Sequence, residues 1–155
     1  MGDLMRRRAM MAAVSGGGDG PLHPLVDGSY ESGYVKITNG NHVWYQKRYA
    51  GNNVQMNLSR WTDGPYQLHA GDVIETTVEV TQITSSEIRL MLRDTGGTNR
   101  ADIMDYVSAP GTYTKTLTVS ADIELSHIRS YWKSGAQKAI FEFEISMYVN
   151  GVRWI

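Results

Sequence analysis

Acidic side chains at two places in the sequence could take part in hydrolytic chemistry. Glu142 and Glu144 are two residues apart on an expected strand, so their carboxylates lie about 7 Å apart on the same face. That separation suits an inverting glycosidase, but a solvated strand face produces it without any cleft. Asp94–Gly96 reads Asp-Thr-Gly, the tripeptide of aspartic proteases, yet Arg93 precedes it and Gly97 follows, which favours a turn. We therefore predict a protein that is not an enzyme.

Metal and cofactor chemistry has no local motif in this chain. The sequence has no cysteine, which excludes disulfides and thiolate ligands. Its four histidines are far apart and form no paired zinc motif: His23, His42, His69 and His127. Phosphate-binding and dinucleotide-binding glycine patterns are also missing. We therefore expect no metal and no cofactor.

Aromatic side chains are the more informative group. Several lie beside amides and cations in the sequence, namely Trp44, Tyr45, Trp61, Tyr66, Tyr131 and Trp132. A flat ring can stack on the apolar C–H face of a sugar, while neighbouring amides and cations bond its hydroxyl groups. Core or rim packing is the alternative role for each ring.

Strand alternation divides these rings between two faces. Trp44 and Tyr45 must point in opposite directions, and so must Tyr131 and Trp132. We expect His127, Arg129 and Tyr131 on an exposed face, and Ile128, Ser130 and Trp132 on the other. Trp61 lies in a turn-rich segment and is the best single candidate for an exposed ring. The candidate ligand-binding residues are Trp61, Tyr131, Arg129 and Tyr66.

Short alternating segments separated by turn residues predict an all-β fold, an antiparallel β-sandwich of jelly-roll type with eight or nine strands. The expected strands are Tyr34–Thr38, His42–Tyr49, Asn53–Ser59, Asp72–Thr81, Glu87–Arg93, Thr112–Val119, Ser126–Trp132, Ala139–Val149 and a short Val152–Ile155. Almost no helix is expected after residue 28. The expected core residues are Val78, Val80, Ile88, Leu90, Leu92, Leu117, Phe141, Phe143 and Ile145.

Four of these segments resemble parts of jelly-roll carbohydrate-binding modules. They are Gly71-Asp72 at the start of a long strand, Glu87–Asp94, Gly111–Val119 and Phe143–Val152. The resemblance covers roughly residues 70–152 and implies a sandwich that binds glycans. It transfers no individual binding residue, because such modules do not keep these residues at fixed positions.

The N-terminal region has a different character from the rest. Residues 1–14 carry three arginines against one aspartate, and a Gly-rich linker follows over residues 15–24. The opening Met1–Arg8 resembles the start of structural proteins of tailed phages and prophages. We predict a docking peptide over residues 1–14, with a disordered tail as the alternative, and a β-sandwich domain over residues 25–155. The docking residues would be Leu4, Arg6, Arg7, Arg8, Met10 and Met11.

Composition and resemblance together favour a phage virion accessory protein that displays a β-sandwich and binds host-surface glycans. The alternatives are a stand-alone carbohydrate-binding module of a bacterial polysaccharide-utilisation system and, less favoured, a small glycan-active enzyme. Net charge is −1, so the domain lacks the basic excess of a nucleic-acid-binding protein. No apolar run has the length of a membrane span. The expected partners are other virion proteins and glycans, with several copies per particle, and we expect synthesis in the host cytoplasm without a signal peptide.

Overall fold

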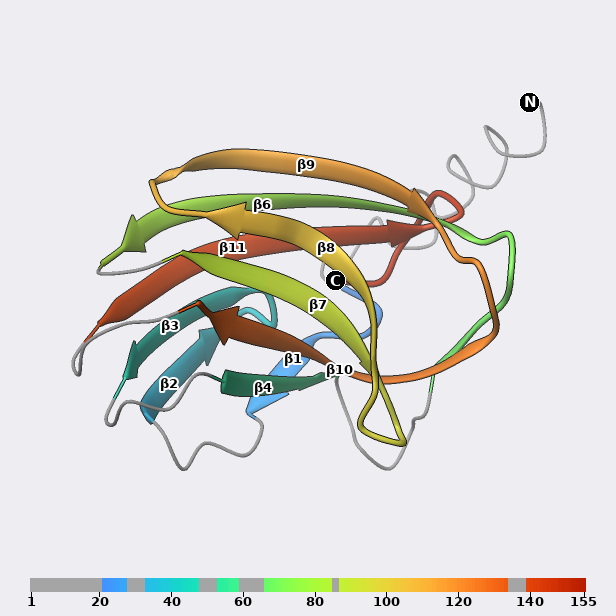
Figure 1. Ribbon diagram of the computed structural model, residues 1–155, viewed down its shortest axis with the longest axis horizontal. Coiled ribbons are helices and arrows are strands. Elements are labelled where there is room, and N and C mark those ends of the chain that lie inside the picture. The colour runs from blue at the N-terminus through green and yellow to red at the C-terminus, as the bar shows by residue number, and fades with distance from the viewer. Residues whose placement is uncertain (1–20, 28–32, 48–52, 59–65, 85–86, 134–138) are drawn as a thin grey trace.

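The computed structural model describes residues 21–27, 33–47, 53–58, 66–84, 87–133 and 139–155. These form two antiparallel β-sheets packed face to face, as Figure 1 shows. Sheet A has the order β1-β4-β10-β7-β8, with β5 also paired to β10. Sheet B has the order β2-β3-β11-β6-β9, with β12 also paired to β11. The antiparallel β-sandwich predicted from the sequence is confirmed.

The strands range from two to eleven residues, and the longest are β6, β10 and β11. In chain order they are β1 (Leu25–Asp27), β2 (Gly33–Thr38), β3 (His42–Lys47), β4 (Asn53–Leu58), β5 (Tyr66–Leu68), β6 (Val73–Ile83), β7 (Ile88–Asp94), β8 (Asn99–Val107), β9 (Gly111–Thr118), β10 (Ile123–Trp132), β11 (Ile140–Val149) and β12 (Val152–Arg153).

Alternating side chains explain why these segments form half-buried strands. In β11 and β6, every second residue is buried, and charged or hydroxyl residues lie between them. Tight turns join the strands where positive φ angles are required, as at Asn39-Gly40 and Asn150-Gly151. The predicted turns at these two places are confirmed.

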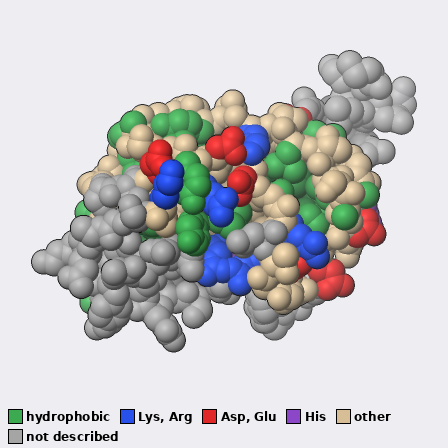
Figure 2. All heavy atoms as spheres, viewed as in Figure 1, with side chains coloured by type: hydrophobic (Ala, Val, Ile, Leu, Met, Phe, Trp, Pro, Cys, Tyr) green, Lys and Arg blue, Asp and Glu red, His purple; other side chains and the backbone are tan. Residues whose placement is uncertain are grey.

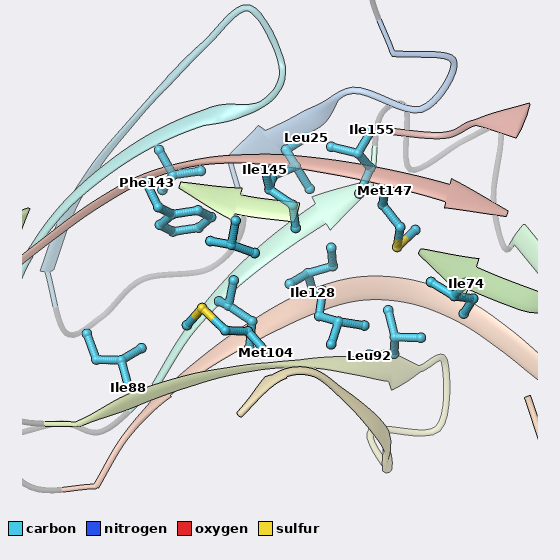
Figure 3. Close-up of a cluster of buried hydrophobic side chains, with 14 of the residues drawn as sticks. Leu25, Ile74, Ile88, Leu92, Met104, Ile128, Phe143, Ile145, Met147 and Ile155 are labelled. Atoms are coloured by element: carbon cyan, nitrogen blue, oxygen red, sulfur yellow. The ribbon is translucent and has the colours of Figure 1, made fainter. Parts of the chain in front are cut away.

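The core lies between the two sheets and draws side chains from both of them, as the close-up in Figure 3 shows. Eight of the nine predicted core residues are buried, and Leu117 is half-buried at the edge of the core. A side-chain bond also crosses between the layers, because the Thr76 hydroxyl donates to the Ile103 carbonyl at 2.8 Å. The inward faces of β6, β7 and β11 were therefore assigned correctly from the sequence.

Three strands were missed by the sequence prediction, so its total of eight or nine was too low. Strands β1 and β5 have three residues each, too few to show a period. Strand β8 pairs with β7 through three register shifts, which break its alternation. Its charged residues, such as Asp102 and Asp105, also hide the strand pattern.

The end of the predicted linker is packed against the domain. The His23 N–H donates to the Trp154 carbonyl at 2.7 Å, and the His23 ring lies 4.0 Å from the Tyr66 ring. Residues 21–24 are therefore part of the ordered structure. The described residues contain no helix, and therefore none long and apolar enough to cross a membrane.

Candidate functional site

The outer face of sheet A is formed around the central pair of strands β10 and β7. Their register places Tyr131 opposite Arg89, Arg129 opposite Met91, and His127 opposite Arg93. Ile128, Ser130 and Trp132 alternate with these residues and point into the core. Figure 2 views the molecule from the side on which β7, β8 and β10 lie in front, and it shows basic side chains beside a hydrophobic strip.

Two tyrosines and one arginine form a stack at one end of this face. The Arg89 guanidinium carbon lies 5.3 Å from the centre of the Tyr131 ring and 5.2 Å from that of Tyr106. These distances are typical of cation–π contacts. Arg89 also pairs with Asp102 at 3.5 Å, and Lys133 lies 5.5 Å from the Tyr106 ring. The stack fixes the positions of two rings on β10 and β8, the strands that flank β7 in one sheet.

Met91 occupies the middle of the same face. It is fully buried, yet it does not belong to the inter-sheet core. Its register partners are Arg129 on β10 and Asp102 on β8. The hydrocarbon stems of long charged side chains commonly cover such an apolar residue while their charged ends reach solvent. Met91 is therefore an apolar residue shielded from solvent at the centre of this face.

The other end of the face holds Arg93 and His127. His127 is buried and its Nδ1 lies 2.6 Å from the Ser126 hydroxyl oxygen, while its Nε2 has no hydrogen-bond partner. Burial, helped by the nearby Arg93 charge and opposed by Asp94, lowers the pKa of His127 to about 4. The ring is therefore neutral at neutral pH. The buried Nε of Arg93 also has no hydrogen-bond partner.

Asp94 fixes the turn between β7 and β8 beside this end. Its carboxylate accepts the Thr98 N–H at 2.8 Å and the Arg100 Nε–H at 2.7 Å. The backbone bond from Thr98 and the Arg100 contact lower the pKa of Asp94, while burial opposes them. The Asp-Thr-Gly sequence therefore forms a turn, as predicted. Both carboxylate oxygens of Asp94 are engaged in holding the hairpin.

The predicted ligand-binding residues do not all meet. Tyr131 and Arg129 share the outer face of sheet A, near the Arg89 stack. Tyr66 lies beyond the other end of β10, where it pairs with Leu125 and packs on His23 and Trp154. Trp61 and residues 1–14, with the docking residues Leu4, Arg6, Arg7, Arg8, Met10 and Met11, lie outside the described residues.

Some residues of this face were missed or misjudged from the sequence. The alternation of Arg89, Met91 and Arg93 was recognised, but their position beside Tyr131 depends on strand order, which the sequence does not give. Tyr106 was missed because β8 was not predicted. His127 was expected to be exposed and is buried. A register shift between Leu125 and His127 displaces the strand at this point.

The acidic pair on β11 does not form a catalytic arrangement. The Glu142 carboxylate is hydrogen-bonded to the His42 Nε2 at 2.9 Å, while Glu144 is exposed. Both lie on the outer face of sheet B, opposite in direction from the buried Phe141 and Phe143. Within the described ranges, no group of three His, Asp or Glu side chains is placed to bind a metal.

Comparisons with known proteins identify the fold. The sequence matches no family model and no curated protein. The structure is similar to a variant of a family 29 carbohydrate-binding module, with a TM-score of 0.52 at 10% identity over 83% of each chain. It is also similar to the low-affinity xylan-binding module CBM86 from Roseburia intestinalis, with a TM-score of 0.54 at 15% identity, over 80% of this chain and 87% of that one.

A third similar structure is a variant of CBM29-2 in complex with cellulohexaose. Its TM-score is 0.52 at 8% identity, over 85% of this chain and 90% of that chain. The class of fold is therefore the two-sheet antiparallel sandwich of carbohydrate-binding modules. Within that class, the similarities span families 29 and 86, and identities this low establish the fold alone. None of the three matches bears on the viral resemblance of Met1–Arg8.

Proposed function

We propose that this domain is a non-catalytic module that binds a polysaccharide on the outer face of sheet A. The observation that carries the proposal is the stack of Tyr131, Arg89 and Tyr106 across three adjacent strands of one sheet. Tyrosine rings on such a surface can stack on sugar rings, and guanidinium groups can donate to several hydroxyl groups at once. The similarity to carbohydrate-binding modules supports the same function.

The shape of the face favours an extended ligand. Arg129 and Tyr131 take successive outward positions on β10, about 7 Å apart, and β7 and β8 add Arg89 and Tyr106 beside them, so the side chains extend across three strands. A chain of sugars lying along or across the sheet would therefore contact successive side chains.

Binding without catalysis follows from how the carboxylates of this face are engaged. Among the described residues, Asp102 pairs with Arg89, and Glu87 pairs with Lys133 at 3.0 Å. Each of these two carboxylates is thus held in an ion pair with a cation of the same face, so neither is free to act as the acid or base of a glycosidase.

The experiment is a comparison of two tyrosine variants on opposite faces. Tyr131→Ala should weaken binding to the best ligand of an oligosaccharide panel by at least about fivefold, the value of one lost aromatic contact. Tyr148→Ala is the matched control, because Tyr148 lies on the outer face of sheet B and is 37% exposed. Calorimetry measures the affinity, and circular dichroism checks folding. A loss caused by Tyr148→Ala alone would place the site on sheet B and refute the proposal.

The biological setting of the module is a separate proposal. Display on a phage particle is supported by the resemblance of Met1–Arg8 and by the Gly-rich segment that follows it. Residues 1–20 lie outside the described residues, so this part of the proposal depends on the sequence. The alternative setting is a stand-alone module of a bacterial polysaccharide-utilisation system.

A further inference from the structure

We infer that the cleft between β8 and β9 is a second sugar-binding subsite, which takes an uncharged terminal sugar of the ligand on the outer face of sheet A. This inference rests on the proposed function and extends its site beyond Tyr106. It is carried by the position of the cleft, by its lining, and by a buried hydroxyl group that holds its walls in place. The terminal sugar can be the end of the main chain or a side branch, and the test distinguishes these two sources.

The cleft lies at one edge of the sandwich, where the last strands of the two sheets meet. Strand β8 ends the order of sheet A and β9 ends that of sheet B, and Figure 1 shows them side by side. Residues of these two strands line a cleft of about 350 Å³. Ligand pockets in proteins have volumes of roughly 300–1,000 Å³, so this cleft is at the small end of the range. A terminal sugar suits that volume better than an extended peptide does.

Tyr106 connects the cleft to the proposed sugar-binding face. The centre of its ring lies 5.2 Å from the Arg89 guanidinium carbon in the stack, and the same residue lines the cleft. Because β8 is the edge strand of sheet A, a ligand that crosses from Tyr131 over Arg89 reaches the cleft at Tyr106. The last sugar of that ligand, or a branch from it, would then enter the cleft.

The lining of the cleft offers both kinds of surface that a sugar ring requires. Ile103, Met104 and Val107 are buried residues of the lining and supply apolar contact, as does the half-buried ring of Tyr113. The Tyr113 hydroxyl donates to the Ala109 carbonyl at 2.6 Å. Its oxygen can still accept a hydrogen bond, so it is able to bind a sugar hydroxyl.

An ion pair in the lining makes an uncharged sugar the best match. The Lys115 ammonium donates to the Asp105 carboxylate at 2.7 Å, and both residues line the cleft. Their opposite charges cancel, so the pair attracts neither an anion nor a cation. An ammonium has three donors and a carboxylate has several acceptor positions, so each partner can also bond a sugar hydroxyl. The side chains of Lys115 and Asp105 are 32% and 75% exposed, which leaves both within reach of a ligand.

A buried threonine holds the two walls of the cleft in place. Thr76 of β6 is 3% exposed. Its hydroxyl donates to the Ile103 carbonyl of β8 at 2.8 Å and lies 3.3 Å from the Lys115 carbonyl oxygen of β9. Both walls therefore share one buried hydrogen-bonding group. The cleft is preformed, so a sugar can bind without first ordering its walls.

The probes are pairs of neutral oligosaccharides that share a main chain and differ in branching. Xylohexaose is compared with arabinose-substituted xylohexaose, cellohexaose with a xylose-substituted cello-oligosaccharide, and mannohexaose with galactose-substituted mannohexaose. Calorimetry on the full chain measures each affinity at low and at high salt. The affinity of the best oligosaccharide should differ by less than about twofold between the two conditions, because an uncharged sugar makes no charge pair that salt can screen. Strongly salt-dependent binding would overturn the assignment to an uncharged sugar.

Two lysine variants test the cleft itself. Lys115→Met removes the ammonium and keeps the length of the side chain, and it should weaken binding of the best oligosaccharide by at least about fivefold, because a hydrogen bond from a charged donor is lost. Lys36→Met is the matched control, because Lys36 is exposed on β2, at the opposite edge of sheet B from β9. It should leave the affinity unchanged. Asp105→Ala should weaken binding in the same way and replaces Lys115→Met if that variant fails to fold, as judged by circular dichroism.

The outcomes separate this inference from the proposed function. A loss confined to the branched oligosaccharides would assign the cleft to a side branch, and an equal loss for the linear ones would assign it to the end of the main chain. If Lys115→Met binds every oligosaccharide as tightly as the wild type, or loses no more affinity than Lys36→Met, the cleft is not a subsite, and weaker binding by Tyr131→Ala would leave the proposed function standing. If the wild type binds none of the oligosaccharides, both the inference and the proposed function fail.

Discussion

The neutral His127 ring should make the stability of the domain depend on pH. Burial lowers the pKa of this ring from an ordinary value of 6.5 to about 4 in the folded protein. Between these values the unfolded chain binds a proton that the folded chain does not, so protonation favours unfolding. The contribution of His127 to stability is therefore complete above about pH 6.5, and it is lost progressively as pH falls towards 4.

The size of the effect follows from the two pKa values. At about pH 4.5, nearly all unfolded molecules have a protonated His127 and most folded ones do not, which costs about 2.5 kcal/mol relative to neutral pH. Carboxylates also titrate as pH falls, so the wild-type curve alone does not isolate this residue. His127→Asn removes the titration and keeps an amide group that can hydrogen-bond with the Ser126 hydroxyl.

The measurement is the free energy of unfolding from urea titrations at several pH values. The wild-type and His127→Asn curves should converge by about 2.5 kcal/mol between neutral pH and about pH 4.5. His69→Asn is the control, because the side chain of His69 is 67% exposed, and its curve should stay parallel to that of the wild type. If the wild-type and His127→Asn curves stay parallel, protonation of His127 does not destabilise the folded protein. Asp94 would then stabilise the protonated ring, and the proposed pH dependence would be refuted.

Two further predictions concern the core and the N-terminal region. Phe143→Ala should lower the free energy of unfolding by about 3–5 kcal/mol, because the ring is buried and stacks on Phe141 with 4.6 Å between ring centres. Denaturant titration measures the loss. The control, Glu144→Ala on the exposed face, should change the free energy of unfolding by less than about 0.5 kcal/mol. Equal losses in the two variants would contradict the assignment of the faces. Deletion of residues 1–14 should leave folding intact yet remove the protein from particles purified from the producing host, and incorporation at the wild-type level would show that this segment is not the anchor.

The fold could be predicted where a strand alternates regularly. In β7 and β11, alternating residues such as Leu90 and Phe143 gave both the strand and its buried face. The prediction failed for β8, where register shifts against β7 remove the period-two pattern. Periodicity therefore detects only those strands that keep one residue facing inward at every second position.

The candidate site could be predicted only in part, for a related reason. The face of β10 that carries Arg129 and Tyr131 follows from alternation along one strand. The contact of Tyr131 with Arg89 joins two strands that are not consecutive in the chain, and the contact of Arg89 with Tyr106 needs the irregular strand β8. Strand order is set by the packing of the whole sandwich, so no local pattern reveals these neighbours.

The hydrogen bond between His23 and Trp154 makes the domain a candidate for circular permutation. It joins the segment before β1 to the segment after β12, so a short peptide could connect residue 155 to residue 21 without disturbing either sheet. New ends could be opened at the exposed bend of Ser108–Pro110, between β8 and β9. In the native order, His42 and Glu142 meet across 100 residues of chain. Permutation would shorten that separation and lengthen those of the β6–β9 and β7–β10 pairs, while the outer face of sheet A kept the same residues.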